Sequence, residues 1–167
     1  MPGRSCLLVT VLMLASQFSF AVNEHEAREA ELISLLAANL ACYSYGKYSN
    51  NLDSQFITST HNKLATSLSE SLALHQLKLE SERLQKTNSD EAKKLLRQNT
   101  IKKLSNHILD GIKKSLEEDY MTGGPEALKA RVDEVFTNSQ YTLPAWLNSC
   151  GDLLNYSKLS IKASAMK

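Results

Sequence analysis

The chain has 167 residues, and its 19 basic and 18 acidic side chains leave a formal net charge of +1. Charges balanced this evenly give no electrostatic basis for binding nucleic acid or an anionic membrane surface. Hydrophobic residues make up 43% of the chain and aromatic residues only 7%, a composition that favours one helical domain over a β-sandwich.

The first 21 residues have the pattern of a cleaved signal peptide. Arg4 precedes an apolar stretch, residues 7–14, which is too short to span a bilayer. Ser19 and Ala21 place small residues at the two positions that a signal peptidase reads. We therefore expect cleavage after Ala21, a periplasmic or secreted protein, and no stable membrane insertion after cleavage. The alternative is an uncleaved membrane anchor.

Cleavage would leave two of the three cysteines, Cys42 and Cys150. An even number of cysteines in an exported chain favours a disulfide, and these two allow only one connectivity. The bond would join the first and last helices across a loop of roughly a hundred residues, which restricts the unfolded chain by about 4–5 kcal/mol in the chain-entropy model. The alternative is a pair of buried free thiols.

The first expected helix runs from about Asn23 to Tyr45. Asn23 is a good N-cap, and Gly46 is suited to a C-terminal stop. The apolar stripe repeats at the spacing of one helix face; its members are Leu32, Leu36, Leu40 and Tyr43.

Tyrosines gather where this helix ends, among Ser, Gly and Asn residues. Such a composition is typical of binding loops, in which rigid rings stand beside adaptable polar groups. Tyr45, Lys47 and Tyr48 are therefore candidate partner-binding residues, and both tyrosine rings are expected to face solvent. The alternative is that they cover the end of the bundle.

Two long helices follow, and the stretch from Tyr48 to Asp110 contains neither Gly nor Pro. Apolar residues recur every three or four positions, which predicts a helix from about residue 53 or 54 to 86 and another from Asn88 to Met121. Glu91 stands three residues after Asn88, at the spacing of a capping box. We expect these two helices to be antiparallel and central.

Two histidines, His61 and His75, occupy positions where the second helix would be expected to carry Leu. They are roughly 21 Å apart along a straight helix, so they cannot share one metal ion. Each is a weak candidate for holding a ligand or metal with groups from another helix, and the alternative is a hydrogen-bonded structural histidine.

The remaining elements are shorter. Gly111 lies beside the apolar stripe of the third helix and predicts a close helix crossing, and residues 122–125, Thr-Gly-Gly-Pro, predict a stop. A fourth helix is expected from Pro125 and a fifth from Thr142, with residues from about 156 onward forming a short extension or a disordered tail.

The sequence contains no HExxH, GxSxG or P-loop motif, and the part after residue 21 contains no CxxC. We therefore expect no enzyme activity and no cofactor. The predicted plan is an all-α, single-domain bundle of about five helices, exported and acting by binding another protein. In architecture alone it resembles small bacterial envelope proteins, including helical immunity proteins that block cell-wall-degrading toxins. The alternative function is a helical bundle that binds a small ligand or metal.

Overall fold

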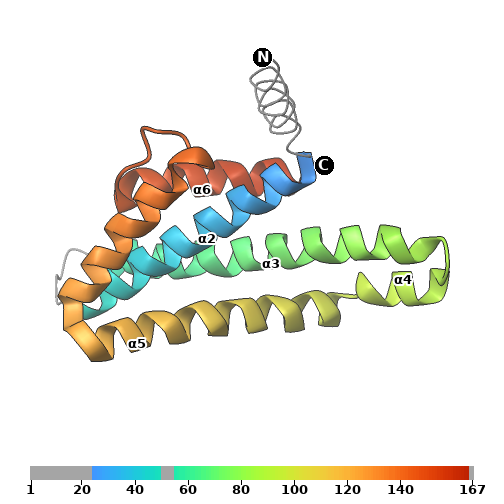
Figure 1. Cartoon of the computed structure of the whole chain (residues 1–167), viewed down its shortest axis with the longest axis horizontal. Helices are drawn as coiled ribbons and strands as arrows, with labels where there is room; N and C mark the ends of the chain where they lie inside the picture. Colours follow the sequence, from blue (N-terminus) through green and yellow to red (C-terminus); the bar gives the residue numbers. More distant parts are fainter. Residues whose placement is uncertain (1–23, 50–54, 166–167) are drawn as a thin grey trace, which may run out of the picture.

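In the computed structural model, residues 24–49 and 55–165 are described, and they form an all-α bundle (Figure 1). The elements are α2 (Glu24–Tyr48), α3 (Gln55–Gln85), α4 (Ser89–Leu95), α5 (Gln98–Asn138), the 3-10 turn η2 (Ser139–Tyr141) and α6 (Cys150–Ala165). The predicted all-α class with about five helices is confirmed. The predicted signal peptide lies outside the described residues. None of the helices in the described ranges has both the length and the apolar character that crossing a membrane requires.

The two longest helices, α3 and α5, run antiparallel beside each other, as predicted (Figure 1). Helix α2 contacts α3, α5 and α6, so it is the central element of the main core. Leucines dominate this core because their spacing places them on one face of each helix. The most deeply buried are Leu32, Leu35, Leu36, Leu40, Leu68, Leu128 and Leu153.

A second, smaller core lies in the α3–α4–α5 hairpin, which extends beyond α2 and α6 in Figure 1. Ala73 and Leu77 of α3 pack there against Ile101 of α5. Among the described residues, this second core consists of few buried side chains and includes none from α2 or α6.

The predicted third helix is interrupted near its start. Asn88 caps α4 as expected: its Oδ1 accepts a hydrogen bond from the Glu91 backbone N–H at 3.2 Å. The helix nevertheless ends at Leu95, because Arg97 adopts an extended backbone (φ −69°, ψ 142°) before α5 begins. Thr100 Oγ1 donates to the Lys94 carbonyl at 3.2 Å and satisfies one of the acceptors left at the break.

Helix α5 bends at the predicted stop. Gly124 has φ 64° and ψ −155°, a backbone conformation almost restricted to glycine, and Pro125 follows it. The two predicted helices on either side therefore meet end to end, and the chain changes direction there (Figure 1). Arg131 bridges the bend with two bonds to the Asp119 carboxylate, from Nε at 2.9 Å and from Nη2 at 3.3 Å.

The last helix differs from its prediction at both ends. Residues 142–149 form a connection, and α6 begins at Cys150 because Ser149 Oγ accepts from the Asp152 backbone N–H at 3.3 Å as its cap. The helix continues to Ala165, so the predicted extension or disordered tail from 156 is wrong. Ser157 and Ser160 are buried on its inner face, and these polar residues hid the helical periodicity.

Neither of two glycines has the role expected of it. Gly46 lies inside α2 rather than at its end, and a Cβ atom there would collide with Thr58 Oγ1 of α3. At Gly111 an added Cβ would meet nothing within 4 Å. The close helix crossing is therefore at Gly46, between α2 and α3.

Candidate functional site

The predicted disulfide joins α2 to α6. The Cα atoms of Cys42 and Cys150 are 5.8 Å apart, a separation typical of a disulfide, and 108 positions separate the two residues in sequence. Cys42 is buried, whereas Cys150 is half-buried at the edge of the main core. The predicted pairing is therefore confirmed.

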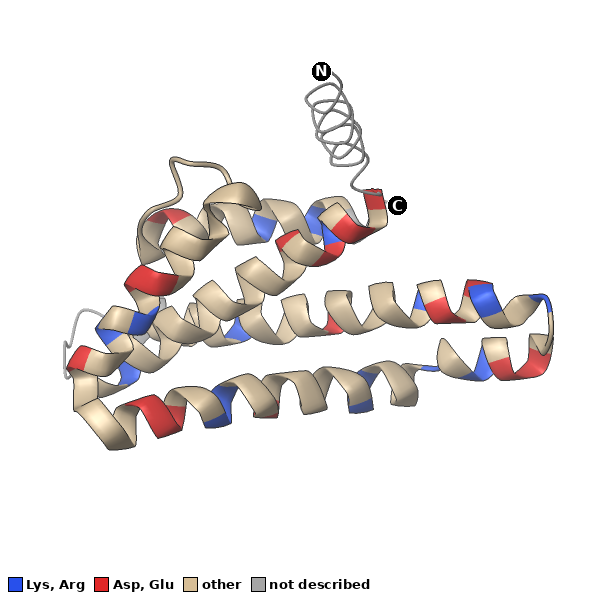
Figure 2. Cartoon of the chain, viewed as in Figure 1, with Lys and Arg blue, Asp and Glu red and all other residues tan. Residues whose placement is uncertain are grey.

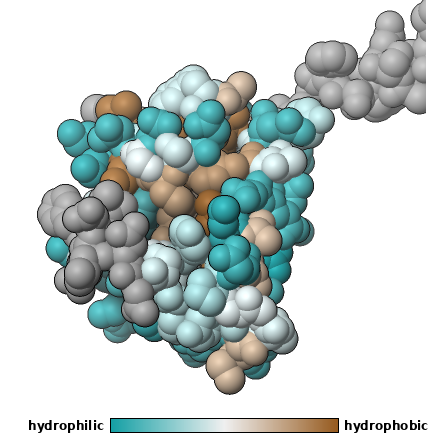
Figure 3. Space-filling model, turned by 90° about the vertical axis from the view of Figure 1, so that its left-hand side faces the viewer, coloured by the Kyte–Doolittle hydropathy of each residue, from teal (hydrophilic) through white to brown (hydrophobic). Residues whose placement is uncertain are grey.

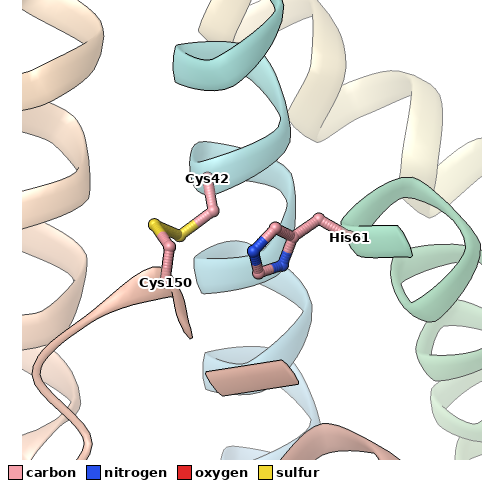
Figure 4. Close-up of side chains that lie close together, drawn as sticks. All are labelled: Cys42, His61 and Cys150. Atoms are coloured by element: carbon pink, nitrogen blue, oxygen red, sulfur yellow. A yellow bond between two sulfur atoms is a disulfide. The ribbon is translucent and has the colours of Figure 1, made fainter. Parts of the chain in front are cut away.

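His61 of α3 lies beside this disulfide. Only 1% of its side chain is exposed. One ligand atom from each of Cys42, His61 and Cys150 lies within 4.8 Å of the other two. Figure 4 shows the imidazole approaching from α3 with its outer nitrogen, Nε2, directed toward the sulfur atoms. Three helices thus bring two sulfur atoms and an imidazole to one point.

A buried hydrogen-bond network fixes the orientation of this ring. The Asn39 amide donates from Nδ2 to the Leu35 carbonyl and to Ser157 Oγ, both at 2.8 Å. Asn39 Oδ1 therefore faces His61 Nδ1, 2.8 Å away, and must accept its proton. The neutral ring then has its proton on Nδ1, and Nε2 presents a lone pair. Nε2 is buried, and no hydrogen bond of normal geometry reaches it from the described residues, although the Cys150 backbone lies near enough to the ring to raise its pKa.

Burial also determines the charge of His61. Removal from solvent lowers the pKa of the imidazole to about 4, and the backbone of Cys150 opposes this effect only in part. The ring is therefore neutral at ordinary pH. A neutral imidazole, with an unprotonated ring nitrogen whose lone pair is available, is the form that binds metal ions.

The second candidate histidine, His75, lies in a different place. Its Nε2 is 3.0 Å from the backbone carbonyl of His25, and the two rings are 5.7 Å apart between centroids. As expected, His61 and His75 do not belong to one site. His75 instead lines a cleft of about 660 Å³ between α2, α3 and α6, together with His25, Arg28 and Tyr156.

Polar contacts between α2 and α6 form one wall of this cleft. Arg28 donates to Ser160 Oγ at 3.0 Å and pairs with Glu31. The Tyr156 hydroxyl donates to Glu31 Oε1 at 3.2 Å. Burial and the nearby Glu31 charge raise the pKa of Tyr156. Sequence reasoning missed this group because it treated residues from 156 onward as a tail.

The three candidate partner-binding residues lie at the end of α2. Tyr45 and Tyr48 are half-buried and pack against the main core, so the expectation that both rings face solvent is wrong. Helix α2 continues through Tyr48, whose ring stacks on Tyr120 of α5 with centroids 4.0 Å apart. Lys47 is exposed and donates from Nζ to the Tyr48 hydroxyl at 3.2 Å. A role for these residues in binding stays a prediction.

More exposed apolar side chains lie elsewhere. Tyr141 and Trp146, on the segment between α5 and α6, are 89% and 59% exposed, and Leu159 of α6 is 64% exposed. Figure 3 views the end of the molecule at the left of Figure 1, and apolar residues gather near the middle of that face among hydrophilic ones. The exposure of Trp146 was not predicted from the sequence, because a helix starting at Thr142 was expected to carry it on its apolar stripe.

Charged residues are mixed in sign, with Lys and Arg interspersed among Asp and Glu along α3 and α5 (Figure 2).

No known family model, curated protein or solved structure matches this chain. The side chains described above are therefore the basis for inferring a function.

Proposed function

We propose that this protein is exported and acts by binding another protein. The observation that carries the proposal is the group formed by Trp146, Tyr156 and Leu159. Trp146 is 59% exposed, although Trp is among the residues most enriched in binding hot spots. An exposed tryptophan is a typical anchor for a protein partner.

The geometry around Trp146 holds the ring in place before any partner binds. Its ring meets Tyr156 edge-on, with centroids 5.9 Å apart and planes at 82°. Tyr156 is fixed in turn by its hydrogen bond to Glu31. Leu159 is three residues after Tyr156 in α6, so the two side chains are neighbours on one helix face. A ring that is already ordered loses less entropy on binding.

The Cys42–Cys150 disulfide supports the exported part of the proposal, because disulfides persist in oxidising compartments. Export also requires that residues 1–21 are removed. Protein recovered from its native host should therefore begin at Val22 when its N-terminus is sequenced. An inhibitor or immunity protein of a cell-wall-degrading toxin is the most specific form of the proposal, and it depends on architecture alone.

Affinity capture from an envelope extract tests the binding proposal. The wild-type chain should retain one stoichiometric partner, and Trp146→Ala should lose it while changing stability by less than about 1 kcal/mol. Met121→Ala is the matched control, because Met121 is 81% exposed at the bend of α5 and lies outside the Trp146 group. Wild-type protein that retains no stoichiometric partner under several growth conditions would contradict the proposal.

The cleft beside His75 favours a second candidate function, the binding of a small aromatic ligand. Its volume of about 660 Å³ is in the range of small-molecule sites. His25 and His75 offer aromatic rings to such a ligand. Native mass spectrometry of protein purified from its host should then detect a bound ligand, and His75→Ala should release it. Protein at its unliganded mass, with no thermal shift from a ligand library, would exclude this function.

A further inference from the structure

The junction of α2, α3 and α6 has a second chemical state, which exists when the disulfide is reduced. Two thiolates and one neutral imidazole are an established ligand set for Zn²⁺, with the fourth position left to water. The ligand atoms of Cys42, His61 and Cys150 already lie within 4.8 Å of one another. A tetrahedral zinc ion needs them roughly 3.5–3.8 Å apart, given Zn–S distances of about 2.3 Å. Rotation of the cysteine side chains is enough to separate the sulfur atoms that far.

His61 is prepared for such a role by its surroundings. A metal-bound histidine usually donates its other ring N–H to an oxygen atom, which fixes the tautomer and the orientation of the ring. Asn39 Oδ1 accepts that bond from Nδ1, and Asn39 is itself held by Leu35 and Ser157. The lone pair of Nε2 therefore points to the sulfur atoms, and this buried atom has no hydrogen-bond partner in the described part of the chain. An unpartnered buried nitrogen normally costs free energy, and a metal ion at this point would satisfy it.

We propose that the reduced protein binds Zn²⁺ through Cys42, His61 and Cys150, and that formation of the disulfide releases the ion. A dithiol supplies two electrons and two protons to the disulfide and becomes a disulfide itself. The two cysteine thiols then lose their protons to water as they bind Zn²⁺. In the reverse direction, a disulfide oxidant accepts two electrons from the two thiolates, and the new bond removes both sulfur ligands.

The position of Cys150 provides a route for this exchange. Cys42 is 4% exposed, whereas Cys150 is half-buried and follows the connection 142–149. An attacking thiolate therefore reaches the Cys150 sulfur first and forms a mixed disulfide, with Cys42 leaving as the thiolate. The second thiol of the reductant then releases Cys150, which lies at the start of α6, where the helix dipole stabilises a negative charge.

Co²⁺, which reports tetrahedral thiolate coordination by its absorption bands, is the probe for a direct test. The chain from Val22 is reduced with a phosphine in the absence of oxygen and titrated with Co²⁺, and Zn²⁺ is then added as a competitor. We expect one Co²⁺ per chain, with thiolate-to-cobalt charge-transfer bands that Zn²⁺ abolishes. Zn²⁺ should raise the melting temperature of the reduced protein and leave that of the oxidised protein unchanged.

Variants distinguish this site from binding by any pair of free thiols. His61→Ala should weaken Co²⁺ binding by at least about tenfold, and His75→Ala, in the same helix, should leave it unchanged. The double variant with Cys42→Ser and Cys150→Ser should lose the charge-transfer bands, while its circular dichroism spectrum should still be that of a helical protein.

Three outcomes would overturn the proposal. They are a folded reduced protein without tetrahedral Co²⁺ bands, equal affinity in wild type and His61→Ala, and equal binding by the oxidised chain. If the reduced chain unfolds, recovery of helix on addition of Zn²⁺ supports the proposal, and failure to recover overturns it.

Discussion

His61 illustrates how far one residue could be interpreted from sequence. Its position on an apolar stripe marked it as unusual. The alternative of a hydrogen-bonded structural histidine is correct for one ring nitrogen, because Nδ1 is hydrogen-bonded to Asn39. Its partner Asn39, and Ser157, which holds Asn39, belong to other helices, 22 and 96 positions away from His61 in sequence, and no local pattern indicates such contacts. The disulfide was predicted from the cysteine count and the export signal, but its position beside His61 depends on the packing of three helices.

The buried His61 makes stability depend on pH. Its pKa is about 4 in the folded protein and 6.5 in the unfolded chain, so both states hold the neutral ring above pH 6.5. As the pH falls from 6.5 to about 4, only the unfolded chain takes up the proton, and stability is lost. The loss levels off below about 4 and amounts to about 3 kcal/mol at most.

Urea unfolding of wild type and His61→Gln across this pH range measures the effect. Carboxyl groups titrate in both proteins, so the difference between the two curves isolates the imidazole. Wild type should lose more stability than the variant on acidification, and parallel curves would show that the ring is not buried as described.

The close approach at Gly46 leads to a second prediction. Gly46→Ala places a Cβ atom against Thr58 Oγ1 and should lower stability by about 1–3 kcal/mol through overpacking. Removing the hydroxyl with Thr58→Ala should restore part of this loss, so the two changes should be non-additive in a double-mutant cycle. Additive effects would place the cost elsewhere than in this contact.

At the scale of the elements, periodicity predicted where helices lie better than where they end. The stripes that identified α2, α3 and α5 are the faces that pack in the main core. The break at Arg97 and the full length of α6 were missed. The break depends on an extended residue that no Gly or Pro marks, and the length of α6 depends on polar residues that face α2. Asn88 and the Gly124–Pro125 pair were identified because caps and turns depend on local chemistry.

The bend in α5 should be sensitive to its glycine. Gly124→Ala meets no steric obstacle, since an added Cβ has nothing within 4 Å, yet φ of 64° with ψ of −155° strains any residue with a side chain. We expect a loss of about 1–3 kcal/mol. Gly111→Ala is the matched control within α5: it lies in a regular stretch with open space and should gain about 0.5–1 kcal/mol. Thermal unfolding of both variants tests this, and equal effects would contradict it.

At the scale of the whole molecule, composition, apolar periodicity and the cysteine pair were enough to predict an all-α bundle whose first and last helices are joined. They could not predict the cleft beside His75 or the Trp146 group, because each is assembled from helices distant in sequence. Sequence patterns describe one helix at a time, whereas sites form where helices meet.

The disulfide should contribute much of the global stability. Reduction frees a loop with ends 108 positions apart, which corresponds to about 4–5 kcal/mol in the chain-entropy model. We expect the melting temperature to fall substantially on reduction, with helix content near native at room temperature. Thiol titration of the unfolded, non-reduced chain from Val22 should find no free thiol; two reactive thiols would refute the bond.

The same bond determines how the molecule responds to tension. Force applied between residues 24 and 165 passes through Cys42 and Cys150, so only the segments outside the bond can be stretched. The α3–α4–α5 hairpin, with its small separate core, is thereby shielded from mechanical load. Single-molecule stretching should release about 350–390 Å of additional contour length after reduction, from 108 residues at about 3.3–3.6 Å each. A protein anchored at its two ends would thus keep this hairpin folded under load for as long as the bond is intact.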